Sequence, residues 1–215
     1  MRHKINHPPL LLATSNQGKQ REYRELLEGL PFTLVFPQDV ASERAPKVEE
    51  SGATYAQNAA LKARAWAKIT GWLTLADDSG LEVAALGGAP GLYSARLAPQ
   101  PHATDADRRR YLLAQLTGKP RPWQARFVCV IAVATPGGAL HFAEGVCHGE
   151  IIAQERGDHG FGYDPLFLLP DLGLTMAELQ PEEKNRRSHR ARAATVIRPI
   201  LQALAPRQHL GGESR

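Results

Sequence analysis

The stretch "PLLLATSNQGKQREYRELLEGLPFTLVF", residues 9–36, decides the fold class of this 215-residue chain. Residues 9–16 predict a buried strand that runs into a polar turn, because a short apolar run ends in Thr, Ser and Asn. Residues 18–30 repeat apolar side chains with the 3.6-residue period of a helix, and residues 32–36 are again rich in strand formers. Strand, turn, helix and strand in this order are typical of an α/β fold.

Downstream, strands and helices continue to alternate, with one interruption. Residues 124–152 hold two arms of strand formers around the turn "PGG", which predicts a long β-hairpin. A hairpin among strand and helix pairs favours a mixed sheet with helices packed on it. Further helices are predicted over residues 54–70, over residues 104–116 with Thr104 as N-cap, and from Ser188 to about Ala205 with Pro199 inside.

The chain is long enough for one large domain or two small lobes. No run of about 18 apolar residues occurs, and the apolar segment near the N-terminus is too short and wrongly flanked for a signal peptide, so we expect a cytoplasmic protein. Cys129 and Cys147 lie in strand-like runs without metal-ligand spacing, so we expect small buried side chains rather than a disulfide.

Basic residues gather in "KNRRSHRARAATVIRP", residues 184–199, in a chain of formal net charge +4. Such a cluster is compatible with a nucleic-acid surface, a phosphate-binding wall or a solvated helix face, of which the last is the commonest.

The stretch "LADDSGLEV", residues 75–83, carries adjacent carboxylates between two strand-like segments. Asp-Ser-Gly is the local signature of half an aspartic protease site, and the same oxygens could hold a divalent metal against phosphate. Strand alternation sends Asp77 and Asp78 to opposite faces, so they do not share a proton with each other. The chain has no second Asp-Ser/Thr-Gly, and a lone aspartate at a strand end is commonly a turn former. With Glu50 close by, a Mg²⁺ site is the better functional hypothesis.

Other polar groups follow the predicted elements. The turn "TSNQGK", residues 14–19, places backbone N–H groups and Lys19 at a helix start, which favours an anion, although many strand-to-helix turns look alike. Lys62 lies on the predicted helix and could instead be a solvated lysine. "FGYD", residues 161–164, offers aromatic rings beside a carboxylate, and residues 184–190 offer donors at a helix start.

Five stretches in order and spacing resemble the inosine/xanthosine triphosphate pyrophosphatase family, whose members remove non-standard purine nucleotides, from about residue 10 to residue 204. They are "ATSNQGK" (13–19), "SGATYAQNAALKA" (51–63), "ADDSGLEVAALGGAPGLYSAR" (76–96), "FGYDPLF" (161–167) and "EEKNRRSHRARA" (182–193).

The resemblance implies an elongated mixed sheet with flanking helices that form two lobes around a nucleotide cleft. It further implies one domain over residues 1–215, a homodimer, Mg²⁺ as cofactor and a purine nucleoside triphosphate as substrate, with no membrane or nucleic-acid partner. Residues 206–215 are expected to form a frayed tail.

By the same resemblance, Asp78 is the catalytic carboxylate and a metal ligand, and Glu50 is the second metal ligand. The implied substrate contacts are Thr14, Ser15, Asn16, Gln17, Gly18, Lys19, Lys62, Ser79, Phe161, Gly162, Tyr163, Asp164, Lys184, His189 and Arg190. Ser15 departs from the pattern, since many relatives have glycine there, and we expect altered loop detail rather than lost activity.

The implied reaction converts ITP, dITP, XTP and dXTP to the monophosphate and pyrophosphate. Donors at Lys184, His189 and Arg190 would favour the 6-oxo bases over adenine, whereas guanine must be rejected at its 2-amino group by a residue that the sequence does not identify. Two alternatives stay open, namely a pyrophosphatase for other modified nucleotides and a basic nucleic-acid-binding protein.

Overall fold

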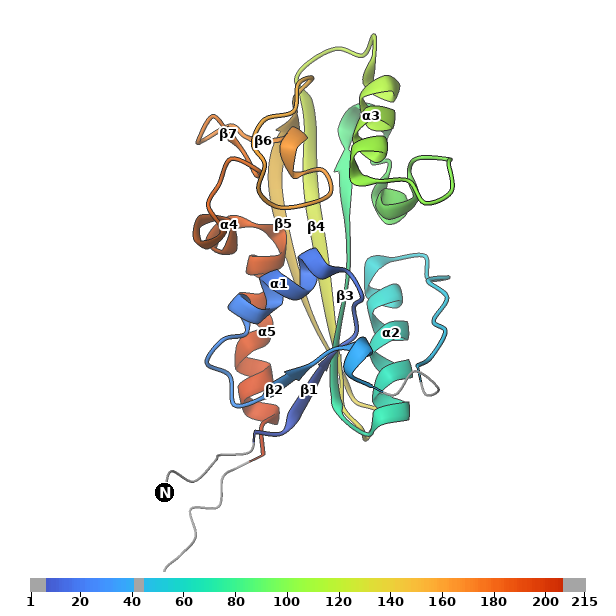
Figure 1. The fold of residues 1–215 in the computed structure, drawn as a ribbon, viewed down its shortest axis with the longest axis vertical. Coiled ribbons are helices and arrows are strands. Elements are labelled where there is room, and N and C mark those ends of the chain that lie inside the picture. Colours follow the sequence, from blue (N-terminus) through green and yellow to red (C-terminus); the bar gives the residue numbers. More distant parts are fainter. Residues whose placement is uncertain (1–6, 41–44, 207–215) are drawn as a thin grey trace, which may run out of the picture.

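The computed structural model describes residues 7–40 and 45–206 and has a seven-stranded mixed sheet at its centre (Figure 1). The strand order is β2-β1-β3-β4-β5-β6-β7, with β1 parallel to both of its neighbours and the other pairs antiparallel. The strands are β1 (Pro9–Leu12), β2 (Thr33–Val35), β3 (Leu73–Val83), β4 (Trp123–Ala134), β5 (Leu140–Ile151), β6 (Phe167–Leu169) and β7 (Leu174–Thr175). The predicted α/β class and the predicted hairpin, which is β4 and β5, are confirmed.

Strands β3, β4 and β5 run through the length of the molecule and join its two ends (Figure 1). The stretch "LADDSGLEV" lies within β3, which joins the strand-like segments predicted on either side of the two aspartates into one strand. Pairing continues through the motif because Ser79 faces Cys129 and Gly80 faces Val128 in β4. Gly80 also lets the chain at Gly91 approach closely, since a Cβ at position 80 would lie 2.3 Å from the Gly91 carbonyl oxygen.

Helices cover both faces of the sheet. Helix α2 (Tyr55–Thr70) packs on β3 and β4 from one side, and α5 (His189–Leu204) packs on β4 and β5 from the other. Thr54 caps α2 by accepting from the Gln57 N–H, and Ser188 caps α5 by accepting from the Ala191 N–H. The predicted starts of both helices are therefore confirmed, and α5 continues unbroken through Pro199.

Two shorter helices belong to the same half of the molecule as α2 and α5. Helix α1 (Gln17–Leu26) follows β1 as predicted and lies on the α5 side of the sheet (Figure 1). Helix α4 (Pro181–Arg187) directly precedes Ser188 and was not predicted as a separate helix.

The opposite end of the molecule is built on α3 (Asp105–Leu116), whose Thr104 cap is confirmed. Leu112 and Leu116 on α3 pack with Leu81, Trp123 and other side chains in a core of their own. Two further cores lie on the two faces of the sheet around β1. These separate cores at the two ends of the long strands are the two lobes expected for the fold.

The remaining predictions concern the two cysteines, the number of domains and the C-terminal tail. Cys129 and Cys147 are both buried and free, as predicted. The organisation of residues 1–215 as one domain stays a prediction, and the expected frayed tail lies outside the described residues except for Pro206. In the described ranges, every helix is too short or too polar to cross a bilayer.

Candidate active site

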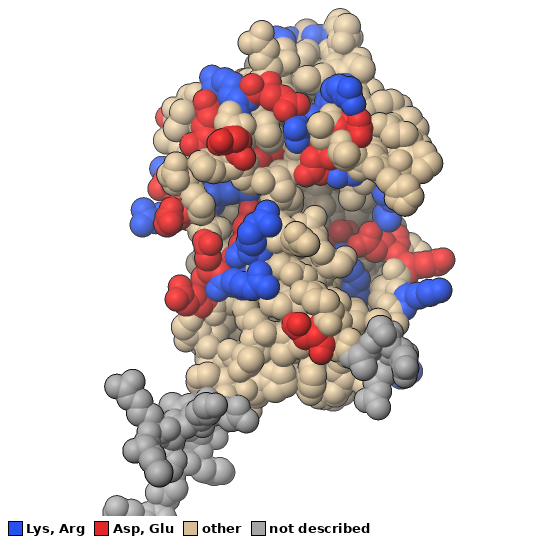
Figure 2. Space-filling view, viewed as in Figure 1, with Lys and Arg blue, Asp and Glu red and all other residues tan. Residues whose placement is uncertain are grey.

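A cavity of about 390 Å³ opens between the two halves of the molecule, along one edge of β3. Figure 2 shows a hollow between the upper and lower halves of the molecule, with acidic and basic side chains around it. Strand β1 pairs with β3 only over Leu73–Leu75, and four consecutive residues beyond this pairing, Asp78 to Leu81, line the cavity. Because the cavity runs along a strand edge, side chains from both faces of the sheet reach it.

The cavity brings together almost all the residues singled out in the sequence. Lining it are Thr14, Ser15, Asn16, Lys19, Glu50, Lys62, Asp78, Ser79, Phe161, Gly162, Tyr163, Asp164, Lys184, His189 and Arg190. Gln17 and Gly18 are absent from this lining: Gln17 is exposed, and Gly18 lies under the Phe161 ring, where a Cβ would come within 2.5 Å of Cδ1.

One end of the cavity is formed by Asp78 and the helix that faces it. Asn58 donates to Asp78 Oδ2 over 3.0 Å, and Lys62 Nζ lies 3.8 Å from Oδ1. Burial raises the pKa of Asp78 above its ordinary value, against the opposing effects of Lys62 and Asn58. A raised pKa is the property expected of a carboxylate that accepts a proton during catalysis.

Glu50 shares Lys62 with Asp78. Lys62 Nζ lies 2.8 Å from Glu50 Oε1, and Arg96 NH1 lies 3.3 Å from Oε2. Burial raises the pKa of Glu50, but the hydrogen bond and charge of Lys62 outweigh it and lower the pKa overall. An ammonium group therefore already lies between the two carboxylates, which marks this place as favourable for a cation.

Asp77 points to the opposite face, as strand alternation predicted, and is 2% exposed. Its Oδ2 lies 2.9 Å from Lys19 Nζ and 3.5 Å from Arg190 NH2. Burial raises the pKa of Asp77, but the charges of Lys19, Arg190 and Lys62 outweigh it and hold the pKa well below the ordinary value. Asp77 is thus a permanent anion that fixes two cations at the cavity wall.

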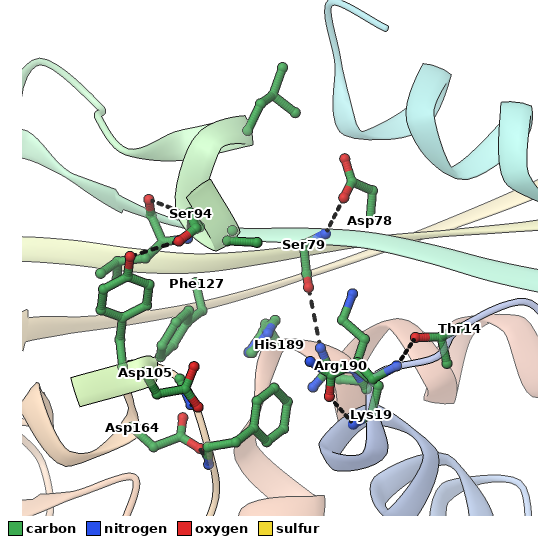
Figure 3. A pocket seen from close by; sticks show the side chains of 18 of the residues that line it. Thr14, Lys19, Asp78, Ser79, Ser94, Asp105, Phe127, Asp164, His189 and Arg190 are labelled. Carbon is green, nitrogen blue, oxygen red and sulfur yellow. Dashed lines mark hydrogen bonds between the residues drawn. The ribbon is translucent and has the colours of Figure 1, made fainter. Parts of the chain in front are cut away.

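Ser79 connects the two faces. Its backbone N–H donates to Asp78 Oδ1 over 3.1 Å, and its Oγ accepts from Arg190 NH2 over 3.3 Å (Figure 3). The side chains of Asp78 and Ser79 point away from each other, toward α2 and toward α5 respectively (Figure 3).

Lys184 lies in a buried ionic network on the far wall. Its Nζ lies 2.7 Å from Glu22 Oε1 and also donates to Asp164. Burial lowers the pKa of Lys184, but Asp164 and Glu22 outweigh it and raise the pKa, so the ammonium is charged. Glu22 also accepts from Arg190, and the network therefore ties α1, α4 and α5 together. Glu22 was not predicted as a site residue, because the only feature that distinguishes it in the sequence is its place on the more buried side of α1.

His189 is buried and stacks on Phe127 of β4, with ring centroids 4.7 Å apart. Burial, and then the charges of Arg190 and Lys184, lower the pKa of His189 well below its ordinary value. The imidazole is therefore neutral at neutral pH and offers one N–H donor.

The segment "FGYD" is held at three successive residues. Phe161 N–H donates to Asp164 Oδ2 over 2.8 Å, Gly162 contacts α3, and Tyr163 Oη donates to the Ser94 carbonyl over 2.7 Å. The Phe161 ring lies 4.9 Å from Lys184 Nζ, at cation–π range. Ser94, Asp105, Arg108 and Phe127 also line the cavity and were missed from the sequence, since nothing local distinguishes them from ordinary helix and strand residues.

All five basic side chains that line the cavity have carboxylate partners. Lys19 pairs with Asp77, Lys62 with Glu50, Arg108 with Asp105, and both Lys184 and Arg190 with Glu22. The walls are therefore close to neutral, and a highly charged anion would need a further cation to enter. Two carboxylates and the phosphates of a substrate are the usual ligands of Mg²⁺, so Asp78 and Glu50 suit that ion.

The chain is similar to known proteins over most of its length. A protein from Desulforamulus reducens named dITP/XTP pyrophosphatase is 48% identical over 196 residues, which cover 91% of this chain and 96% of that protein. A dITP/XTP pyrophosphatase from Gloeobacter violaceus is 50% identical over 189 residues, covering 87% of this chain and 91% of the relative. A solved HAM1 protein structure from Coxiella burnetii superimposes with a TM-score of 0.81 at 41% identity, covering 91% of this chain and 99% of that chain.

The family model described as the Ham1 family matches residues 10–200, nearly the whole chain. The fold, the cavity and the motifs around it lie within this match, and on these grounds the chain belongs to the Ham1 family.

Proposed function

We propose that this chain hydrolyses non-standard purine nucleoside triphosphates, ITP, dITP, XTP and dXTP, to the monophosphate and pyrophosphate. The observation that carries the proposal is the cavity itself, where Asp78, Glu50 and Lys62 form one end and Phe161, His189 and the Lys184 network form the other. The first end suits phosphates, and the second suits a flat base with oxo acceptors. Relatives named dITP/XTP pyrophosphatase support the same substrate class.

In the proposed reaction, the bridge between the α- and β-phosphates breaks. A water molecule supplies its hydroxyl group to one phosphorus, and its proton is taken up by the site and passed to solvent or product. Asp78 is the group we assign to that proton, because it faces the cavity and burial raises its pKa above the ordinary value of an aspartate. Lys62 and Lys19 line the cavity and would stabilise charge on the phosphate oxygens, and Asp77 fixes the position of Lys19.

Mg²⁺ is the cofactor we propose, with Asp78 and Glu50 as its protein ligands. When bound, it would neutralise phosphate charge that the paired cations of the wall cannot meet alone. If Mg²⁺ took the place of Lys62 Nζ between Asp78 and Glu50, Lys62 would be free to contact a phosphate oxygen.

Base selection rests on donors that are fixed before a ligand arrives. Arg190 is held by Glu22 and Asp77, and the neutral His189 is held against Phe127. Among the described residues, Arg190 Nε and His189 Nδ1 are buried without a hydrogen-bond partner, which is costly in a core and common at binding sites. A 6-oxo purine offers acceptors on this side, whereas adenine offers a 6-amino donor.

The nucleic-acid alternative finds little support in the basic segment of residues 184–199. Lys184 and Arg190 are buried, and Arg192 and Arg198 donate to backbone carbonyls of Val146 and Leu26. The protease alternative requires a second Asp-Ser/Thr-Gly in an all-β fold, and the observed fold is α/β. Action on other modified nucleotides stays a second candidate that the same assay tests.

The deciding experiment is pyrophosphate release from a panel of dITP, XTP, dATP, dGTP and a methylated or modified pyrimidine triphosphate, with Mg²⁺ and with a chelator. We expect fast release from dITP and XTP, and a loss of about 10²-fold or more in kcat for Asp78→Asn. Equal turnover of all purine triphosphates would contradict the specificity, and an active Asp78→Asn would contradict the mechanism. The homodimer stays a prediction, which light scattering of the purified protein tests.

A further inference from the structure

Both polar backbone groups of Gly162 are held by one helix of the upper lobe in Figure 1. The Gly162 N–H donates to Asp105 Oδ2 over 2.7 Å, and the Gly162 carbonyl accepts from Arg109 NH1 over 2.9 Å. Asp105 is the first residue of α3 and Arg109 follows one turn later, so their side chains lie on one face of the helix. Helix α3 thus forms hydrogen bonds with both the N–H and the carbonyl of a single residue of the "FGYD" segment.

The Gly162 backbone is in the left-handed region, with φ at 64°, which glycine adopts without steric cost but as one of many accessible conformations, so the two contacts with α3 help to hold this one. Arg109 also lies 2.9 Å by its Nε from Glu155 Oε1, which ties the start of the same long connection to the same side chain. The connection between β5 and β6 is otherwise largely irregular, and segments of that kind open with low free energy when few contacts hold them.

The position of Gly162 helps to set the position of Phe161, whose N–H is also held by Asp164. The Phe161 ring reaches across the cavity to α1, where it covers Gly18, and it lies 4.9 Å from Lys184 Nζ and 5.5 Å from Arg190 Cζ. Gly162 is therefore held by the α3 lobe, while the ring of the preceding residue, Phe161, contacts the α1 lobe. Movement of the Gly162 backbone would carry the ring away from the base-binding end of the cavity.

We propose that Asp105 and Arg109 are positioning residues for substrate binding, which hold Gly162 so that Phe161 forms the wall against which the base stacks. This rests on the proposed function. Neither residue is needed to hold α3 on the protein, because Leu112 and Leu116, further along the same face, pack in a buried core and Thr104 with Asp107 caps the helix. Asp105 lines the cavity near the segment, but its contact with the Gly162 N–H, not with substrate, carries the assignment.

The test compares Arg109→Met with Arg110→Met, two adjacent arginines of α3. Arg110 is exposed and its guanidinium pairs with Asp107, away from the segment, so it is a matched control. We expect Arg109→Met to raise KM for dITP about tenfold, as the loss of one charged hydrogen bond predicts, with kcat nearly unchanged. Arg110→Met should leave both constants at their wild-type values.

The conservative replacement separates positioning from charge. Asp105→Asn keeps an oxygen that accepts from the Gly162 N–H, so it should retain most of the affinity that Asp105→Ala loses. If Asp105 acted through its ion pair with Arg108, both replacements would be equally harmful, and the inference would be overturned.

Hydrogen exchange supplies a readout that does not need activity. Amides of residues 156–164 should exchange faster in Asp105→Ala and Arg109→Met than in the wild type, while amides of α3 itself and the melting temperature stay close to wild type. Unchanged exchange in that segment, or equal acceleration by Arg110→Met, would overturn the inference. A wild-type protein that releases no pyrophosphate from dITP would refute the proposed function, and the exchange comparison would still decide whether α3 holds the segment.

Discussion

Lys62 donates a hydrogen bond over 2.8 Å to Glu50, and the same nitrogen lies 3.8 Å from Asp78. One ammonium group thus bridges the two carboxylates that the sequence suggested as metal ligands. Glu50→Gln should raise the Mg²⁺ concentration for half-maximal activity by about tenfold or more, because a neutral amide is a weaker ligand. The measurement is a Mg²⁺ titration of pyrophosphate release from dITP.

The neighbouring Glu49→Gln is the control for that titration, because Glu49 is exposed and does not line the cavity around Asp78. It should titrate as the wild type does. A Glu50→Gln variant with an unchanged Mg²⁺ requirement would remove Glu50 from the metal site.

Asp77→Asn should destabilise the protein by about 3 kcal/mol or more near neutral pH, because it leaves Lys19 without its anion and Arg190 with Glu22 alone. The folded-state pKa of Asp77 lies well below the unfolded value, so the ionised group stabilises the fold above the ordinary pKa of aspartate, near 3.8. That contribution is lost as the pH falls below this value. Urea unfolding at several pH values should therefore show a deficit that is constant near neutrality and shrinks in acid, whereas a deficit independent of pH would point to packing alone.

Gly18→Ala should weaken substrate binding without weakening the fold. The new Cβ would lie 2.5 Å from Phe161 Cδ1, so the ring must move, while alanine favours the helix over glycine by about 1 kcal/mol. We expect a higher KM for dITP and a melting temperature no lower than that of the wild type. In a Phe161→Ala background, Gly18→Ala should have no further effect on KM, and additive effects would show that Gly18 acts in another way.

His189 should remain neutral at a pH where an ordinary histidine is protonated, which NMR of the labelled imidazole measures directly. Because its folded-state pKa is lowered below the unfolded value, protonation favours unfolding, and the protein should lose stability as the pH falls through about 6.5. His189→Gln should make the unfolding free energy less dependent on pH by up to about 1.4 kcal/mol per pH unit, the effect of one proton. The exposed His148→Gln is the control, and a wild-type slope in His189→Gln would show that His189 is not the group responsible.

The order of the elements could be predicted because each depends on residues close in the chain. The 3.6-residue period of α2, the caps Thr104 and Ser188, and the short glycine-bearing turn of the hairpin are local signals, and the structure confirms each. The continuity of the strand through "LADDSGLEV" has no such local signal, since Asp and Gly disfavour strands. Ten consecutive register pairs with β4 override that preference and keep β3 continuous.

The class of fold, the family motifs and the opposite directions of Asp77 and Asp78 follow from the amino-acid sequence, because period and alternation are properties of the chain. That both faces of β3 serve one cavity follows from long-range contacts instead, since β1 ends beside Leu75 and leaves the edge of the strand open. Long-range contacts also set the charge states of the site. The pairing of Glu22 with Arg190 and Lys184 joins residues far apart in the chain, and the burial that shifts their pKa values exists only once the helices have packed together.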